Sequence, residues 1–166
     1  MTIQHTMKHT YHQFPQKPDF EQKFKFGADL PYIVSVIAGM DGQSGTFITD
    51  APDLKGSTIK AKRAINIDIV DKSTDFHSLN KDNVGTVLHG LDSEGTVDFR
   101  VNLRYTYLDA KYDRVPFKGD SYLVRTNLQN GVLTMKVHHI DGMGRTESGR
   151  IADTIVEEIK RNAPDV

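Results

Sequence analysis

The sequence contains no cysteine and no tryptophan. Without cysteine there can be no disulfide, no thiol nucleophile and no thiolate ligand for a metal ion. The same absence is typical of proteins in a reducing compartment. An excess of charge is also missing, because 22 Asp and Glu residues nearly balance 21 Lys and Arg residues. We therefore expect neither a nucleic acid nor a membrane surface as a partner, since the chain has no strong field to attract either.

Long apolar runs are absent as well. No stretch approaches the roughly 20 residues of a membrane-spanning helix. The first residues, MTIQHTMKHTYHQ, lack the apolar centre of a signal peptide. A cytoplasmic location is the expectation that remains. The length of 166 residues, with 37% hydrophobic and 26% charged residues, is typical of one globular domain.

Residues 1–20 are polar and include two prolines, which predicts a flexible N-terminal arm ahead of a single domain over 21–166. Three histidines of this arm, His5, His9 and His12, would share one face of a helix and could bind a metal ion. No carboxylate or cysteine ligand accompanies them, so we expect a solvated tail and no metal site.

Most of the remaining chain carries the signals of β-strands. Apolar and polar residues alternate along 57–70 and 96–108, the period of a strand with one buried face. Further strands are predicted at 32–38, 46–49, 84–91, 121–129 and 132–140. The short segment DSEG suits a hairpin between 84–91 and 96–108, and Asn130-Gly131 is the strongest short-range hairpin signal.

Only 148–162 reads as a helix. Ser148 can cap it, Pro164 lies beyond its end, and isoleucines recur every four residues from Ile151 to Ile159. At least six strands joined by short turns, followed by one helix, predict a mainly β protein: an antiparallel β-barrel or strongly curved sheet with a C-terminal α-helix. The alternative is a helix-grip α+β fold, in which a helix lies in a curved sheet. It would require a helix between the first two strands, where GMDGQSG and DAPDLKG both read as loops.

Two adjacent histidines occupy the last predicted strand. The two-residue turn at Asn130-Gly131 sets the register of its hairpin and pairs Tyr122 with His139. The apolar side chains of both strands share the face of this pair. His139 is therefore predicted to face the core and His138 the solvent.

Tyr122 and His139 are the candidate catalytic residues. A tyrosine and a histidine side by side on an apolar face can bind a polar group, or transfer a proton near neutral pH, because the ordinary pKa of histidine is about 6.5. The alternative is that both are polar residues satisfied by neighbours at the rim of the barrel.

Arg63 is the only charged residue in the apolar phase of 57–70. An unpaired buried guanidinium is prohibitively costly, so three explanations compete. Arg63 can form a buried ion pair, it can lie at the barrel mouth with its end in water, or it can anchor an anionic ligand.

Tyr105 and Tyr107 end the inward row of 96–108, where aromatic side chains either line a ligand mouth or belong to the core. The connection 109–120 is long for neighbouring antiparallel strands, and loops of this length are often lids. Under it Tyr105, Tyr107, Tyr122 and His139 can gather. We therefore predict Arg63, Tyr105 and Tyr107 as ligand-binding residues.

The segment DGMGRTESGR (141–150) follows a strand and opens a helix, as a nucleotide-binding loop does. Its glycines do not give G-x-G-x-x-G, and no GK[ST] follows. The remaining hypothesis for this segment is an anion bound at the helix N-terminus with Arg145 or Arg150.

Two segments, SGTFITDAPDLKGSTI (44–59) and DSEGTVDFRVNLRYTYLD (92–109), resemble the G-T-F…P-x-L-x-G and D-G…D-x-R-Y-T elements of DUF3237, a family of small bacterial and fungal β-barrel proteins of unknown function. The resemblance implies a calycin-like barrel and no established catalytic residue. Lipocalins share the barrel-then-helix order, but their G-x-W signature needs the tryptophan that this chain lacks.

Two functions follow from these shapes. The first is a small-molecule-binding barrel that can also act as an isomerase, cyclase or lyase on a small, largely apolar substrate, by acid–base chemistry and without a cofactor. The second is a non-enzymatic structural or interaction protein with a filled core, for example a subunit of a homo-oligomer.

Overall fold

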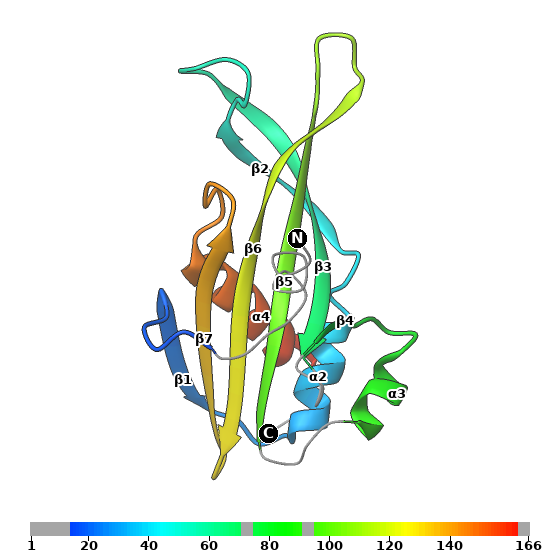
Figure 1. Ribbon diagram of the computed structural model, residues 1–166, viewed down its shortest axis with the longest axis vertical. Coiled ribbons are helices and arrows are strands. Elements are labelled where there is room, and N and C mark those ends of the chain that lie inside the picture. Colours follow the sequence, from blue (N-terminus) through cyan, green and yellow to red (C-terminus); the bar gives the residue numbers. More distant parts are fainter. Residues whose placement is uncertain (1–13, 71–74, 91–94, 163–166) are drawn as a thin grey trace, which may run out of the picture.

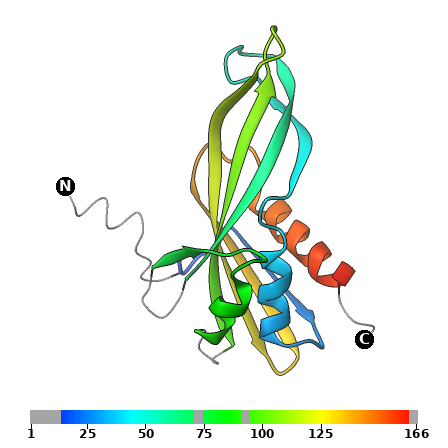
Figure 2. The same cartoon turned by 90° about the vertical axis from the view of Figure 1, so that its right-hand side faces the viewer.

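The computed structural model describes residues 14–70, 75–90 and 95–162. Within them, all strands join one curled antiparallel sheet, and helices cover one of its faces (Figures 1 and 2). The strands are β1 (Phe20–Lys25), β2 (Ser44–Asp50), β3 (Thr58–Val70), β4 (Phe76–Ser78), β5 (Thr96–Leu108), β6 (Arg114–Gln129) and β7 (Val132–Asp141). The helices are α2 (Leu30–Ala38), α3 (Val84–His89) and α4 (Ser148–Asn162).

The sheet has the order β1-β7-β6-β5-β3-β2, and the short β4 pairs with the end of β3. Since β1 and β2 are its two edges, the sheet forms a half-barrel with the C-terminal helix packed on it. The predicted mainly β, antiparallel fold with a C-terminal helix is confirmed. None of the described helices combines the length and the apolar character needed to cross a membrane.

A single core fills the inner face of the half-barrel. It joins β3, β5, β6 and β7 to α2 and α4. The predicted isoleucine spacing of α4 is confirmed, because Ile151, Ile155 and Ile159 are 6%, 1% and 0% exposed. The hairpins β2–β3 and β5–β6 extend beyond the helices, at the top of Figure 1.

Residues 32–38, predicted as a strand, belong to helix α2, so this prediction is wrong. The Asp29 carboxylate accepts a hydrogen bond from the Tyr32 backbone N–H at 3.1 Å, and Pro31 lies in the first turn. This cap and the burial of a helical stripe outweigh the β preference of the branched side chains. Because α2 lies between β1 and β2, the helix that the helix-grip alternative requires is present.

The predicted strand 84–91 is also wrong, because α3 occupies Val84–His89. The side chains of Asn80 and Asn83 accept hydrogen bonds from backbone N–H groups of residues 80, 82 and 83, and these bonds form a turn that leads into a helix. The predicted hairpin with 96–108 does not exist, since β5 pairs with β3 and β6. Residues 91–94, which include most of DSEG, lie outside the described part of the chain.

The lid predicted over 109–120 is not a loop. Strand β6 already begins at Arg114, and only a tight turn separates it from β5. In that turn the Asp109 carboxylate accepts from the backbone N–H groups of Lys111 and Asp113, at 2.8 and 3.0 Å. The start of this strand was not predicted because it contains Pro116 and Gly119, and both residue types are unusual in strand interiors.

The β6–β7 hairpin has the predicted register, with Tyr122 opposite His139. The φ angles of Asn130 and Gly131 are 51° and 75°, as a two-residue turn with both residues in the left-handed region requires.

Strand β1 was not predicted, and the described residues before it contact the sheet. Phe14 is 4% exposed and packs with Leu123 on the outer face of the sheet. The described end of the predicted arm is therefore packed on the domain. His5, His9 and His12 lie outside the described residues.

Candidate functional site

A break in the pairing of β5 and β6 gives the site its shape. Leu103 pairs with Asp120, but Tyr105 pairs with Phe117, so β6 carries one extra residue at this level. Gly119 lies within this bulge, and a Cβ atom there would lie 2.1 Å from the carbonyl oxygen of Leu103. Asp120, next to this bulge, shares the inner face with Tyr122 and is 2% exposed.

The Asp120 carboxylate accepts four hydrogen bonds. Oδ1 accepts from the Gly144 N–H at 2.7 Å and lies 2.9 Å from Nε2 of His139. Oδ2 accepts from the Tyr105 hydroxyl at 2.5 Å and from the Arg145 N–H at 2.9 Å. Burial alone would raise the pKa of Asp120, but these bonds outweigh it and hold the pKa below its usual range. The group is an ionised carboxylate.

The glycine-rich segment after β7 wraps around this carboxylate. Gly142 and Gly144 have φ angles of 99° and 78°, which glycine adopts without strain. The backbone N–H groups of Gly144 and Arg145 point at Asp120 and form a nest for an anion. The loop that resembled a nucleotide-binding motif is therefore occupied by an internal carboxylate.

Thr146 joins the remaining polar groups and is 4% exposed. Its hydroxyl accepts from Nη1 of Arg63 at 2.9 Å and lies 3.0 Å from the Tyr105 hydroxyl. The Tyr122 hydroxyl donates to its carbonyl oxygen. A continuous chain of hydrogen bonds thus runs from Arg63 through Thr146, Tyr105 and Asp120 to His139.

Tyr105 and Tyr122 are structural donors in this network. Burial, followed by the neighbouring Asp120 carboxylate, raises the pKa of both phenols well above its usual range. Both therefore stay protonated at any physiological pH. Tyr122 is fully buried, and its proton is engaged by a backbone carbonyl.

His139 lies where its register predicts, with its ring centroid 5.1 Å from that of Tyr122. The expected contrast with His138 is wrong, however, because their side chains are 26% and 30% exposed. The inner face ends at His139 and opens to a groove, while His138 on the outer face is partly covered by Asp19, which lies 3.3 Å from its Nδ1 atom.

Tyr107 does not join the network. Its hydroxyl donates to Asp53 at 2.9 Å, and this bond, together with burial, raises its pKa. Phe117 lies between it and Tyr105, with ring centroids 5.7 and 5.4 Å away. Three of the four residues predicted to gather, Tyr105, Tyr122 and His139, are brought together.

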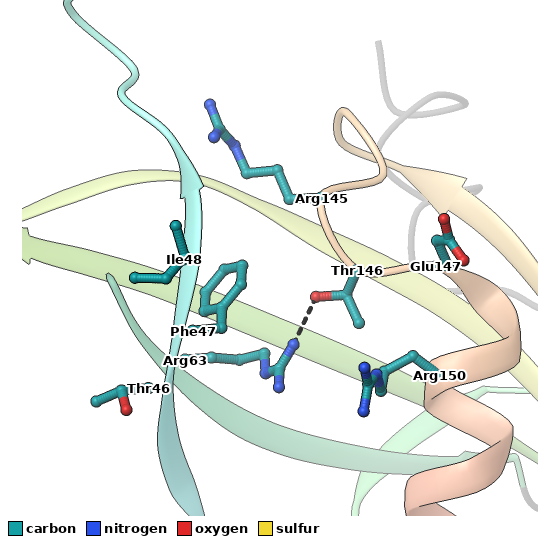
Figure 3. Close-up of a pocket in the computed structure, with 8 residues that line it drawn as sticks. All are labelled: Thr46, Phe47, Ile48, Arg63, Arg145, Thr146, Glu147 and Arg150. Atoms are coloured by element: carbon teal, nitrogen blue, oxygen red, sulfur yellow. Dashed lines mark hydrogen bonds between the residues drawn. The ribbon is translucent and has the colours of Figure 1, made fainter. Parts of the chain in front are cut away.

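Two grooves flank the segment that carries Thr146. The first, which we call the arginine groove, measures about 530 Å³ and is lined by Thr46, Phe47, Ile48, Arg63, Arg145, Thr146, Glu147 and Arg150. Figure 3 shows Arg63 from β3 and Arg150 from α4 pointing toward one another across it. Arg63 also stacks over the ring of Phe47, 4.7 Å from its centroid.

The three arginines of this groove differ in their partners. Arg145 turns toward β2, where Nη1 donates to the carbonyl oxygen of Asp50 at 2.6 Å. Arg63 is half-buried, and in the described part of the chain it donates only to Thr146. Within the described ranges, neither Arg63 nor Arg150 forms an ion pair. The buried ion pair considered for Arg63 is therefore not found among these residues.

The second groove, which we call the histidine groove, measures about 480 Å³. It is lined by Asp19, Phe20, His139, Gly144, Thr146, Glu147, Ser148 and Gly149. The Ser148 hydroxyl, predicted to cap α4, donates instead to Oδ2 of Asp19 at 3.0 Å. The backbone N–H of His139 donates to the same oxygen at 2.8 Å.

Sequence reasoning missed Asp120 and Thr146, the two centres of the network. The signal for Asp120 was present, because it shares the phase of Tyr122 and Val124 on β6. Thr146 carries no pattern of its own. Among the described residues there is no cluster of three His, Asp or Glu side chains that could bind a metal ion.

No model of a known protein family matches the chain, and no curated protein or solved structure is significantly similar to it. The resemblance to the small β-barrel family stays a prediction.

Proposed function

We propose that this protein binds a small molecule with an anionic group, a carboxylate or a phosphate, in the arginine groove. The observation that carries the proposal is the approach of Arg63 and Arg150 toward one another without a carboxylate partner among the described residues. Two guanidinium groups that face each other repel, and an anion between them removes the repulsion and accepts from both.

The other walls of the groove favour a ligand with an apolar part. Phe47 offers the ring on which Arg63 stacks, and Ile48 beside it is 66% exposed. The groove volume of about 530 Å³ falls within the usual range for small-molecule sites. The arginine groove therefore suits a small, partly apolar anion better than a wholly apolar molecule.

The half-barrel interior is not the binding site in this proposal. α2, α4 and fully buried side chains such as Phe99 and Met135 fill the inner face. A filled core agrees with the alternative of a non-enzymatic interaction protein. That alternative does not account for a half-buried arginine that has no ion pair among the described residues.

The proposal is tested by isothermal titration with three probes of similar size: phenyl phosphate, benzoate and benzyl alcohol. We expect the two anions to bind and the uncharged alcohol not to. Arg63→Met keeps the apolar stem on Phe47 and removes the charge. It should weaken binding of phenyl phosphate by about tenfold or more, since one charge-assisted hydrogen bond contributes about 1.5–3 kcal/mol.

Arg150→Met should act in the same direction. The matched control is Arg104→Met, the same change at an exposed position on the opposite face of the sheet, which should leave the affinity unaltered. Equal affinities for the anions and the alcohol, or an affinity that survives both groove substitutions, would rule out the proposed site.

A further inference from the structure

The contact between His139 and Asp120 determines which nitrogen of the imidazole carries the proton. Nε2 lies 2.9 Å from Oδ1 of Asp120. An ionised carboxylate can only accept hydrogen bonds, so Nε2 has to be the donor. In neutral His139 the proton is therefore on Nε2, and Nδ1 carries an unprotonated lone pair.

That lone pair has no partner in the described part of the chain. Nδ1 of His139 makes no hydrogen bond there. It is also not one of the fully buried polar atoms, so it is accessible from outside the protein. The ring lines the histidine groove. By contrast, Nδ1 of the neighbouring His138 is buried beside Asp19.

The charged side chains that surround the His139 ring are carboxylates. Asp120 lies against Nε2, and Asp19 and Glu147 line the same groove. Burial alone would raise the pKa of Asp19, but hydrogen bonds from the His139 backbone and Ser148, and the nearby His138, keep it below its usual range. Among the residues that the structure describes, no arginine or lysine lines this groove. An imidazolium formed here is surrounded by carboxylates.

We propose that the histidine groove is a second ligand site, in which Nδ1 of His139 accepts a proton from an O–H or N–H group of the ligand. The electron pair of the broken bond stays on the ligand, which becomes its conjugate base. The resulting imidazolium is held by Asp120, which acts as a positioning residue, and the proton returns to the ligand in the reverse step. This site does not depend on an anion in the arginine groove.

The proposal first requires one tautomer of His139. ¹⁵N NMR of the full chain at a pH of about 8.5, where imidazoles are neutral, should show His139 with its proton on Nε2 alone. A proton on Nδ1 would overturn the proposal, whatever the behaviour of the variants.

The second measurement tests whether the lone pair is open to the groove. Diethyl pyrocarbonate transfers an ethoxycarbonyl group to an unprotonated imidazole nitrogen, with release of ethyl carbonate. Peptide mapping should find His139 modified, and NMR of the product should place the group on Nδ1. An unmodified His139, or one modified on Nε2, contradicts the proposal.

Asp120→Asn tests the positioning role. The amide can donate as well as accept, so we expect part of the His139 population to carry its proton on Nδ1, with slower modification at that nitrogen. Asp98→Asn is the matched control, because Asp98 is 8% exposed and accepts a hydrogen bond from Arg125 elsewhere in the sheet. It should leave the tautomer unchanged. A tautomer that stays the same in a folded Asp120→Asn variant refutes the role of Asp120.

Discussion

Replacing Asp120 by alanine is expected to lower the free energy of unfolding by about 3–5 kcal/mol, the usual cost of removing one partner from a buried charged network. The substitution leaves the Tyr105 hydroxyl, Nε2 of His139 and the N–H groups of Gly144 and Arg145 without their acceptor. Urea denaturation near neutral pH measures the difference.

The control for this change is Asp141→Ala. Asp141 also forms an ion pair, with Lys118 at 3.0 Å, but the two side chains are 63% and 61% exposed. Removing it should cost less than about 1 kcal/mol. Similar losses at both positions would mean that the contacts of Asp120 do not stabilise the fold.

The Asp120 carboxylate should also make the free energy of unfolding depend on pH in the acid range. Its pKa is lowered in the folded state, so the unfolded chain binds its proton first as the pH falls. The stabilisation is complete above the unfolded pKa of about 3.9 and is lost as the pH falls through the lower folded value. The urea concentration at the midpoint of unfolding, measured from pH 7 to pH 3, should therefore fall more steeply for the wild type than for Asp120→Asn. Parallel curves would contradict the assignment.

Gly142→Ala is expected to cost about 3 kcal/mol or more, through backbone strain and the loss of hydrogen bonds to a charged group. A Cβ atom at this position would lie 2.2 Å from the carbonyl oxygen of Gly119 and 2.3 Å from Oδ1 of Asp120. The φ angle of 99° is also unfavourable for alanine. The loop would have to move, and the N–H groups that bind Asp120 would move with it.

Gly56→Ala separates the two effects. Gly56 has a φ angle of 86°, but no atom lies within 4 Å of the Cβ position. Its substitution should cost about 1 kcal/mol, the strain alone. Thermal and urea unfolding of both variants measure the two losses of stability. A larger loss for Gly142→Ala would show that contact with Asp120 adds to the backbone strain, and equal losses would show that it does not.

Some of this site could be predicted from sequence because its signals are local. The Asn130-Gly131 turn and the alternation on either side of it set the pairing of Tyr122 with His139. The same parity places Asp120 on the inner face, so its presence there could have been predicted. Its partners could not, because they come from β5, β7 and the loop before α4.

Where local signals competed, the prediction was wrong. Residues 32–38 are rich in β-branched side chains, but Asp29 and Pro31 begin a helix just before them. Residues 114–120 contain Pro116 and Gly119 but continue a strand, because their neighbour β5 supplies a long pairing partner. In α2 the burial of apolar side chains against distant elements decided the outcome, and in β6 the backbone pairing with β5 decided it.

The sequence by itself determined the long alternating strands β3 and β5, the C-terminal helix and the register of the last hairpin, because turn chemistry and hydrophobic period act over a few residues. Only the tertiary structure decided that the glycine-rich loop binds an internal carboxylate, that Arg63 and Arg150 approach each other, and that His139 opens to a groove. Each of these depends on which distant segment supplies the hydrogen-bond partner, and no spacing within the chain specifies that choice.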